Sequence, residues 1–241
     1  MIPLRDANPV RRTPIVTIAL IVACVVAFAY QLGLGSESSI RDHFLRFGLV
    51  PAELLAAWDR GQILGDETLA IFSSMFLHAN LIHLVGNLIY LWIFGNNIED
   101  RLGRIPFLLF YLGGGVAAAA AQIAIDPSSE VPMVGASGAI SAVLGAYVVL
   151  FPGARILSLV FLGFFYQLIE VPALIVLVLW FLLQLVDGLG SLGLAGAEGG
   201  VAFFAHIGGF VAGFLVGLLL RAAGGGQERR RRGPLPRAGV G

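Results

Sequence analysis

The sequence predicts an all-α, polytopic membrane protein, and three observations indicate this fold class. Of the 241 residues, 58% are hydrophobic and 12% are charged, whereas about 25% of the residues of an ordinary soluble domain carry a charge. The mean hydropathy is +0.89. The apolar residues also gather into runs that approach the roughly 20 residues that a helix needs to cross a bilayer. One membrane-embedded bundle is therefore expected.

Breaks between the apolar runs predict six transmembrane helices. The first run follows a basic N-terminal segment and is longer than the apolar part of a signal peptide, so we interpret it as an uncleaved span. Pro106 suits the first turn of the third helix, and "FPGAR" ends the fourth. The predicted spans cover residues 14–32, 75–95, 105–124, 136–151, 171–187 and 201–220.

The segments outside the spans complete the expected organisation. Residues 33–70 carry amphipathic stretches such as "PAELLAAWDR", which are typical of short helices at a membrane surface. Residues 156–168 are apolar and aromatic but too short to cross, and we expect them at the interface as well. The predicted domains are a cytoplasmic N-terminus at 1–13, a six-helix membrane domain at 14–221 and a disordered, Arg-rich cytoplasmic tail at 222–241.

The distribution of arginine predicts the orientation in the membrane. All fifteen basic residues are Arg, and six spans would place both termini on one side. Twelve of the fifteen then fall on the side of the termini, and Arg41, Arg46 and Arg60 fall on the other side. Because cytoplasmic loops are enriched in Lys and Arg, both termini are expected in the cytoplasm.

Charge and cysteine content exclude several kinds of partner and site. The formal net charge is zero, so no overall electrostatic attraction favours nucleic acid. The single cysteine, Cys24, lies within an apolar run and excludes an intrachain disulfide and a cysteine-based metal cluster. The composition instead predicts that the protein is surrounded by a lipid bilayer.

Polar side chains inside the predicted spans point to a functional site, because burying them in a bilayer costs free energy. At a rise of ~1.5 Å per residue, Ser137 and His206 lie ~22 Å above the cytoplasmic boundary of their spans. His83 lies ~20 Å above its boundary, and Asn87 follows one helical turn deeper. Polar residues of three spans thus share one level, ~8 Å below the outer edge of a ~30 Å hydrocarbon core.

Small residues would allow the helices that carry Ser137 and His206 to approach each other. Glycines recur every four residues after His206 and form two overlapping GxxxG patterns. Ser141 and Gly145 continue the stripe that begins at Ser137. Two helices with such faces can pack closely, which would bring the imidazole to the hydroxyl. The recurring glycines are Gly209, Gly213 and Gly217.

Together these groups predict the catalytic dyad of a serine hydrolase. A serine hydroxyl becomes a strong nucleophile only when a base removes its proton, and His206 could do so for Ser137. We find no carboxylate at that level of the spans, so a dyad rather than a triad is expected. Attack on an amide forms an oxyanion, which needs hydrogen-bond donors. The Ser137 backbone N–H, His83 and Asn87 could supply them, and Gly135 would let the substrate approach closely.

Each of these residues alone also has a common structural explanation. A serine in a membrane helix often donates to the carbonyl four residues earlier, and His83 or Asn87 could join helices by hydrogen bonds. His206 could instead belong to a proton relay of a transporter or channel, although no internal repeat of the kind found in many transporters is evident. The coincidence of four such residues at one level favours the catalytic interpretation.

The motifs around these residues resemble those of the rhomboid family of intramembrane serine proteases. "GASG" opens the short fourth helix, "HANLIHLVGN" lies on the second span and "AHIGG" on the sixth. "FGNNIEDRLG" followed by "FLLFYLGGG" is also similar to the second and third helices of the family. The resemblance covers roughly residues 70–221.

The resemblance implies a six-helix rhomboid-like bundle in the cell membrane that hydrolyses peptide bonds in or near the transmembrane segments of single-span membrane proteins. By position, Ser137 is the nucleophile and His206 the base. His83 and Asn87 assist the oxyanion together with the Ser137 amide. The family implies no metal and no cofactor, and an active site that opens toward the exterior. The fifth helix and the loop after it, residues 171–200, would form the gate for substrate and water.

Two departures from the family leave an alternative open. Many members carry an aromatic residue one turn after the nucleophile, packed on the catalytic histidine, and this position is Ser141 here. The nearest counterpart of the Trp-Arg pair in the first exterior loop is Trp58-Asp59-Arg60. The alternative is a catalytically silent rhomboid-like protein that binds transmembrane helices. The presence of both Ser137 and His206 favours the protease.

Overall fold

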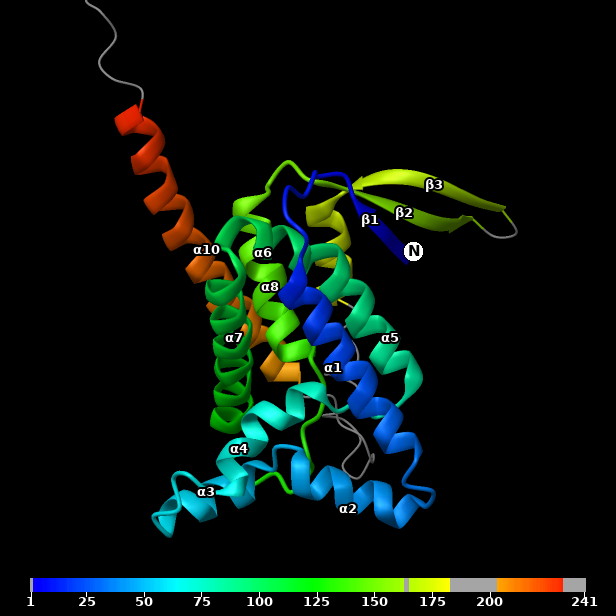
Figure 1. The fold of residues 1–241 in the computed structure, drawn as a ribbon, viewed down its shortest axis with the longest axis vertical. Coiled ribbons are helices and arrows are strands. Elements are labelled where there is room, and N and C mark those ends of the chain that lie inside the picture. The colour runs from blue at the N-terminus through cyan, green and yellow to red at the C-terminus, as the bar shows by residue number, and fades with distance from the viewer. Residues whose placement is uncertain (1, 163–164, 183–202, 232–241) are drawn as a thin grey trace, which may run out of the picture.

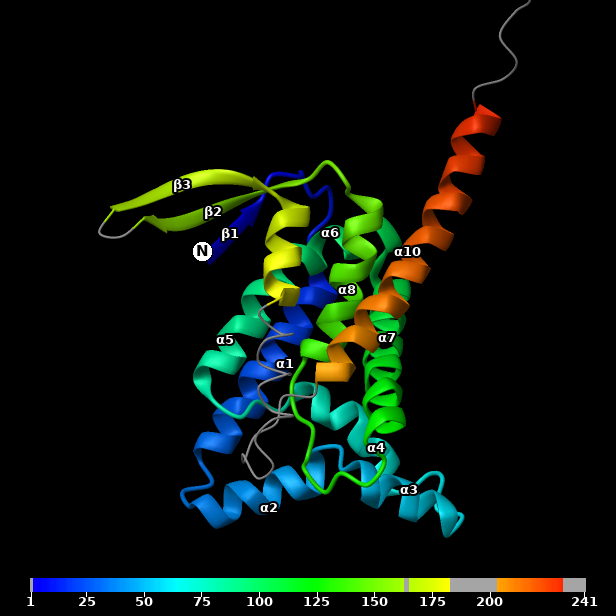
Figure 2. The same cartoon turned by 180° about the vertical axis from the view of Figure 1, so that it is seen from behind.

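The computed structural model describes residues 2–162, 165–182 and 203–231. These residues form a bundle of helices with short helices across one end and a small β-sheet at the other (Figures 1 and 2). Among them, four helices are long and apolar enough to cross a membrane, and two apolar helices are shorter. The four are α1 (Ile15–Leu32), the continuous segment Leu81–Leu102, α7 (Arg104–Ile125) and the first part of α10, Phe203–Ala223; the shorter two are α8 (Ser137–Leu150) and Ala173–Leu182.

Helix α8 forms the centre of the bundle, against α7 and α10. Nearly every side chain from Ala139 to Val149 is buried. Glycine permits this packing, because a Cβ added to Gly145 would collide with the Phe210 backbone. A Cβ added to Gly213 would likewise collide with the Ala142 carbonyl. The α8 and α10 backbones therefore touch directly, through the faces that the small-residue pattern predicts.

The second membrane helix is shifted relative to the prediction of 75–95, which was wrong at both ends. The apolar stretch first forms a short 3₁₀ helix and a loop, and Asn80 then caps the helix by accepting the His83 backbone N–H at 2.8 Å. At the other end the helix runs to Gly103, whose φ of 87° ends it. Hydrophobicity alone does not reveal these caps. The elements are η1 (Ser74–Phe76), α5 (Leu81–Tyr90), the π-helical η2 (Leu91–Gly95) and α6 (Asn96–Leu102).

Helix α1 receives its N-terminal cap from another helix. Its own N-cap residue, Pro14, makes no side-chain hydrogen bond. The buried carboxylate of Glu99 in α6 accepts from the Thr17 N–H at 2.8 Å, the Thr17 hydroxyl at 2.7 Å and the Val16 N–H at 3.0 Å. A carboxylate at a helix N-terminus also interacts favourably with the helix dipole. This contact fixes the start of α1 against α6.

A three-stranded antiparallel sheet corrects the all-α prediction. Its order is β1-β2-β3, and it joins the N-terminus to the segment that follows α8. The segment 156–168 is expected to lie at the interface, and its described parts, 156–162 and 165–168, belong to the antiparallel strands β2 and β3. Their β-branched and aromatic residues favour a strand, but the partner strand at the N-terminus is too far along the chain for a local pattern to reveal. The strands are β1 (Ile2–Asp6), β2 (Arg155–Leu162) and β3 (Phe165–Pro172).

Short helices cover the end of the bundle opposite the sheet (Figure 1). They confirm the helical character predicted for residues 33–70. Ser36 caps the first of them by accepting the Ser39 N–H at 3.2 Å, and Pro51 begins the second. The helices are α2 (Glu37–Phe47), α3 (Pro51–Asp59) and α4 (Asp66–Ser73).

The last helix extends beyond the end of the sixth predicted span. The tail from residue 222 is expected to be disordered, whereas α10 (Phe203–Arg231) is helical to Arg231. The Ala, Gln, Glu and Arg residues of this stretch are good helix formers, whereas its three consecutive glycines are not, and this mixture explains why the sequence does not predict the helix. The remainder of the predicted tail, 232–241, and the predicted gate loop with the end of the fifth span, 183–202, lie outside the described residues.

Replacing Gly213 by Ala is expected to lower the free energy of unfolding by about 1–3 kcal/mol, the usual effect of overpacking a filled core. The added methyl group would collide with the Ala142 backbone, which cannot move aside as a side-chain end could. Thermal unfolding in detergent measures the change. Gly113→Ala in α7 is the control, because a Cβ there meets nothing within 4 Å. Equal stability of the two variants would contradict the direct backbone contact.

Candidate active site

Ser137 and His206 meet at the N-terminal ends of two neighbouring helices. Ser137 is the first residue of α8, and His206 lies in the first turn of α10. The Ser137 Oγ is 2.7 Å from the His206 Nε2, which is hydrogen-bonding distance. The imidazole is 4% exposed, and Ser137 is half-buried. The predicted contact between the fourth and sixth spans is therefore present.

Backbone hydrogen bonds hold the loop that leads to Ser137. Met133 and Leu49 form an isolated antiparallel bridge, and the Gly135 N–H donates to the Ser74 carbonyl at 2.9 Å. Gly135 has a φ of 126°, a conformation that residues with a side chain rarely adopt. The irregular backbone before α8 is thus paired within the protein, as a membrane interior requires.

Two contacts from other helices orient His206. Gln122 of α7 accepts through Oε1 from the Phe204 N–H at 3.1 Å and the Ala205 N–H at 3.3 Å, and so satisfies two backbone donors of the first turn of α10. Trp180, on the helix Ala173–Leu182, packs against the imidazole with ring centroids 5.8 Å apart. The start of α10 is therefore fixed by a hydrogen-bonded cap and an aromatic contact.

Ser141 makes no contact of this kind with the imidazole. Its hydroxyl donates to the Ser137 carbonyl at 2.7 Å, four residues earlier in the same helix. This is the common structural arrangement of a serine in a membrane helix. The aromatic contact on His206 thus comes from Trp180, not from α8.

His83 and Asn87 lie one turn apart on α5 and face the same space as Ser137. A Cβ built on Gly135 would lie 2.8 Å from the His83 Nε2 and 3.5 Å from the Ser137 Oγ, so the imidazole and the hydroxyl flank the space over Gly135. His78 packs edge-on against His83 with ring centroids 5.1 Å apart. The Asn87 Nδ2 is buried and has no hydrogen-bond partner among the described residues. A buried amide donor of this kind is available to a bound group.

A cavity of about 730 Å³ joins these side chains. Its wall combines a few polar groups with apolar and aromatic side chains, the usual composition of a binding site. The structure thus brings together the five residues that the sequence predicts for the site. Lining residues include Ser137, His206, His83, Asn87, Gly135, Gln122, Ile82, Tyr90, Met133 and Trp180.

Two glutamines and a tryptophan that support the site were not predicted. Gln31 of α1 exchanges hydrogen bonds with the His78 backbone, donating to its carbonyl at 2.9 Å and accepting its N–H at 3.2 Å. Gln31 and Gln122 are polar residues within apolar runs, and this signal could have identified them. No local pattern marks Trp180. Among the described residues, no group of three His, Cys, Asp or Glu side chains could hold a metal ion.

Comparison with known families matches residues 65–223 to the rhomboid domain. The chain belongs to the rhomboid family. The matched residues of this rhomboid protein include both helix ends that carry Ser137 and His206, and the α5 helix with His83 and Asn87.

Curated relatives of this rhomboid protein come from several kingdoms. It is 30% identical over 172 residues to Rhomboid protein 1, mitochondrial, of Saccharomyces cerevisiae, and the match covers 68% of this chain and 45% of that protein. It is 35% identical over 156 residues to RHOMBOID-like protein 4 of Arabidopsis thaliana, covering 65% and 35%. It is 29% identical over 127 residues to Rhomboid protease GluP of Bacillus subtilis, covering 53% and 23%. The matches span less than half the length of each of these relatives.

Replacing Gln122 by Met is expected to destabilise the first turn of α10 by about 0.5–2 kcal/mol, the usual effect of losing a helix cap. Met has a similar length but no oxygen to accept from Phe204 and Ala205. Hydrogen exchange should show faster exchange at these two amides. Gln122→Glu keeps an oxygen acceptor and is the control. Unchanged protection in Gln122→Met would contradict the capping contact.

Proposed function

We propose that this rhomboid protein is an intramembrane serine endopeptidase in which Ser137 is the nucleophile and His206 the general base. The observation that carries the proposal is the 2.7 Å distance between the Ser137 Oγ and the His206 Nε2 at the wall of the cavity. A histidine at this distance can take the hydroxyl proton as the bond to the substrate forms. The His206 Nδ1 has no hydrogen-bond partner among the described residues, which supports the proposed dyad.

The reaction follows the usual two steps of acyl transfer. The Ser137 Oγ attacks the carbonyl carbon of the scissile peptide bond, and its proton moves to the His206 Nε2. The C–N bond then breaks, and His206 returns the proton to the leaving amine. The acyl group remains as an ester on Ser137 until a water molecule, deprotonated by His206, hydrolyses it and releases the new carboxyl terminus.

The side chains opposite the dyad would stabilise the oxyanion. Asn87 offers a buried amide donor without a partner among the described residues, and His83 borders the space over Gly135. The Ser137 backbone N–H, at the start of α8, is a third donor, since the first N–H groups of a helix have no partner within it. Such preorganised donors usually contribute about 10²–10³-fold to the rate.

The membrane arrangement follows from the helix lengths. α8 and the helix that begins at Ala173 would be the fourth and fifth of six crossings, and α8, with 14 residues, would be only ~21 Å long. A crossing that short would leave Ser137 below the surface of a ~30 Å core. We place the protein in the cell membrane, with both termini and the sheet in the cytoplasm because of the arginine distribution.

The substrates would be single-span membrane proteins that reach the cavity from the bilayer or its outer surface. Apolar and aromatic residues of the cavity wall, such as Ile82, Tyr90 and Trp180, suit a substrate segment of low polarity. The reaction as written needs no metal or cofactor.

Ser137→Ala and His206→Ala are each expected to lower the cleavage rate by at least about 10³-fold, because each removes one half of the dyad. Proteoliposomes with a fluorescently labelled single-span substrate provide the assay. Ser128→Ala and His43→Ala, in the peripheral loops and α2, are controls that should retain cleavage. Substrate binding without cleavage by the unmodified chain would contradict the proposal and favour the catalytically silent alternative.

Gly135→Ala is expected to lower kcat by about 10²-fold or more, because the methyl group would fill the space between His83 and the nucleophile. Gly61→Ala, next to α3, is the matched control. Gly61 also has a positive φ, 78°, but a Cβ there meets nothing within 4 Å, so this variant carries the backbone strain alone. Equal kcat in the two variants would show that the space over Gly135 is not used by the substrate.

Cysteine labelling tests the proposed orientation. In a Cys24→Ala background, Ser128→Cys should react with an impermeant maleimide added outside intact cells, because Ser128 lies in an exposed loop at the end opposite the sheet. Gly153→Cys, exposed between α8 and β2, should react only after the membrane is opened. The reverse pattern would overturn the assignment of the cytoplasmic side.

A further inference from the structure

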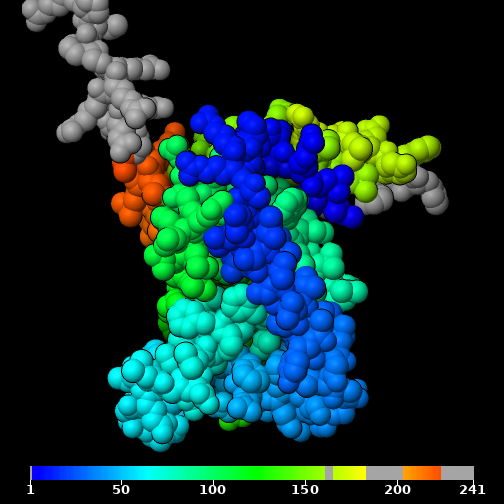
Figure 3. All heavy atoms as spheres, in the orientation of Figure 1, coloured from blue at the N-terminus to red at the C-terminus, as the bar shows by residue number. Residues whose placement is uncertain are grey.

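The β-sheet leaves the bundle sideways at the level where helices begin and end. β1 precedes α1, β2 follows α8, and β3 leads directly into the helix Ala173–Leu182. The hairpin of β2 and β3 projects to one side of the helices and does not continue their direction (Figures 1 and 2). In the space-filling view the yellow-green hairpin stands out beyond the helical body (Figure 3). A sheet in this position runs along the surface of the membrane that the helices cross.

The face of the sheet turned toward the bundle is identified by burial and register. Ile156 and Ser158 of β2 are 0% exposed, and they pair with Val171 and Ile169 of β3. Because side chains alternate along a strand, Phe165 lies on this same face. Ile169 is 42% exposed and Phe165 is 78% exposed. Beyond the helices this face therefore carries the exposed side chains of Ile169, Gln167 and Phe165, of which two are apolar.

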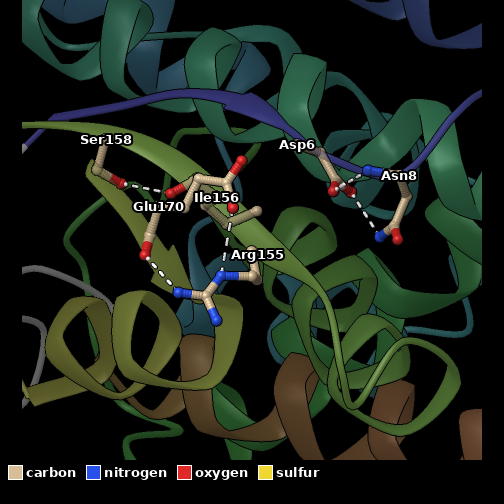
Figure 4. Close-up of polar contacts among 6 residues, drawn as sticks. All are labelled: Asp6, Asn8, Arg155, Ile156, Ser158 and Glu170. Atoms are coloured by element: carbon tan, nitrogen blue, oxygen red, sulfur yellow. Dashed lines mark hydrogen bonds and ion pairs between the residues drawn. The ribbon is translucent and has the colours of Figure 1, made fainter. Parts of the chain in front are cut away.

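The exposed charged side chains of the sheet lie on the opposite face, whereas the buried Asp6 of β1 pairs with Ile156 on the bundle-side face. Arg5 pairs with Leu157, and Leu157 pairs with Glu170. Arg155, two residues before Leu157, shares their face and forms an ion pair with Glu170 at 3.3 Å (Figure 4). Tyr166 and Leu168 also lie on this face and are exposed. The sheet thus separates exposed charge from the bundle-side surface of Phe165 and Ile169.

Buried hydrogen bonds fix the sheet to the bundle, so its orientation is set by the fold. The Asp6 carboxylate at the end of β1 accepts from the Tyr147 hydroxyl of α8, from the Asn97 Nδ2 of α6 at 2.7 Å and from the Asn8 backbone N–H at 2.8 Å (Figure 4). Ile156 and Val171 pack into the core at the base of the hairpin. These contacts therefore fix the orientation of the sheet, with its bundle-side face turned toward the space beside the helices.

We propose that the bundle-side face of the β2–β3 hairpin rests on the lipid bilayer, with Phe165 and Ile169 in its interfacial region. Three observations favour lipid over a protein partner. The hairpin leads directly into a helix whose Leu174, Ile175 and Val178 side chains are exposed. The exposed charges of the sheet point away from this face, and Phe165, the first residue of β3, is aromatic, as is common at membrane interfaces. Exposed Arg11 and Arg12 on the adjoining N-terminal segment complement anionic headgroups. The bilayer would thus hold the segment that leads into the helix bearing Trp180.

Spin labels on single cysteines test this contact without any reference to proteolysis. In the Cys24→Ala background, labels are placed by Phe165→Cys and Ile169→Cys on the bundle-side face, and by Leu168→Cys on the opposite face. The proteins are reconstituted into vesicles of phosphatidylcholine and phosphatidylglycerol. Each label's collision rates with oxygen, which concentrates in lipid, and with a water-soluble nickel chelate are then compared. Size-exclusion profiles and unfolding temperatures like those of the Cys24→Ala protein establish that each variant is folded.

The ratio of the oxygen collision rate to the nickel-chelate collision rate is expected to be higher for the labels at 165 and 169 than for the label at 168. Equal ratios at all three positions, or the reverse order, would overturn the proposal. A second copy paired along the open edge of β3 is the competing occupant. It would broaden the spectra by spin–spin coupling that weakens as the protein is diluted with lipid, and that result would also overturn the proposal.

Discussion

Where α8 and α10 cross, glycine removes the side chains that would keep the two backbones apart. Gly145 lies against the Phe210 backbone, and Gly209 and Gly213 lie against carbonyls of α8. A serine hydroxyl extends only a short distance from its backbone, so an imidazole on another helix can meet it only if the helices approach this closely. In a bilayer, where lipid tails are as apolar as leucine, such close packing is also a main source of attraction between helices. The geometry of Ser137 and His206 thus depends on a stripe of residues that have no chemistry of their own.

Polar groups in apolar surroundings serve as connectors between elements. Glu99 caps α1 from α6, Gln122 caps α10 from α7, and Gln31 ties α1 to the loop before α5. Each pairing satisfies backbone groups that would otherwise be costly to bury. Each also sets the position of one helix end relative to a second helix. Since Ser137 and His206 both lie at helix ends, this arrangement of caps determines the site as much as the packing does.

The sequence predicts the bundle and the site better than it predicts what surrounds them. The helices near 14–32 and 105–124 agree with α1 and α7 to within a residue or two, because each is one uninterrupted apolar run. Ser137, His206, His83 and Asn87 could be grouped because polar residues are rare in such runs and depth can be counted from the span ends. The start of α5 was missed because Asn80 caps a helix inside a hydrophobic stretch. The sheet and Trp180 were missed because both depend on contacts between distant parts of the chain.

The pairing of β1 with β2 also bears on how the chain is assembled. Residues 2–6 are made before the helices, but their partner strand at 155–162 is made only after α1, α5, α7 and α8. While the helices enter the membrane during synthesis, the backbone of β1 is therefore not yet paired with β2. The Asp6 carboxylate also lacks its hydrogen bond from Tyr147 until α8 is in place. Such long-range pairing forms slowly, because the entropy of closing a large loop is lost before the strands gain any stabilising contact. Closure of the sheet is thus a late folding event, and a ribosome that stalls before residue 155 would leave the first strand with no edge to join.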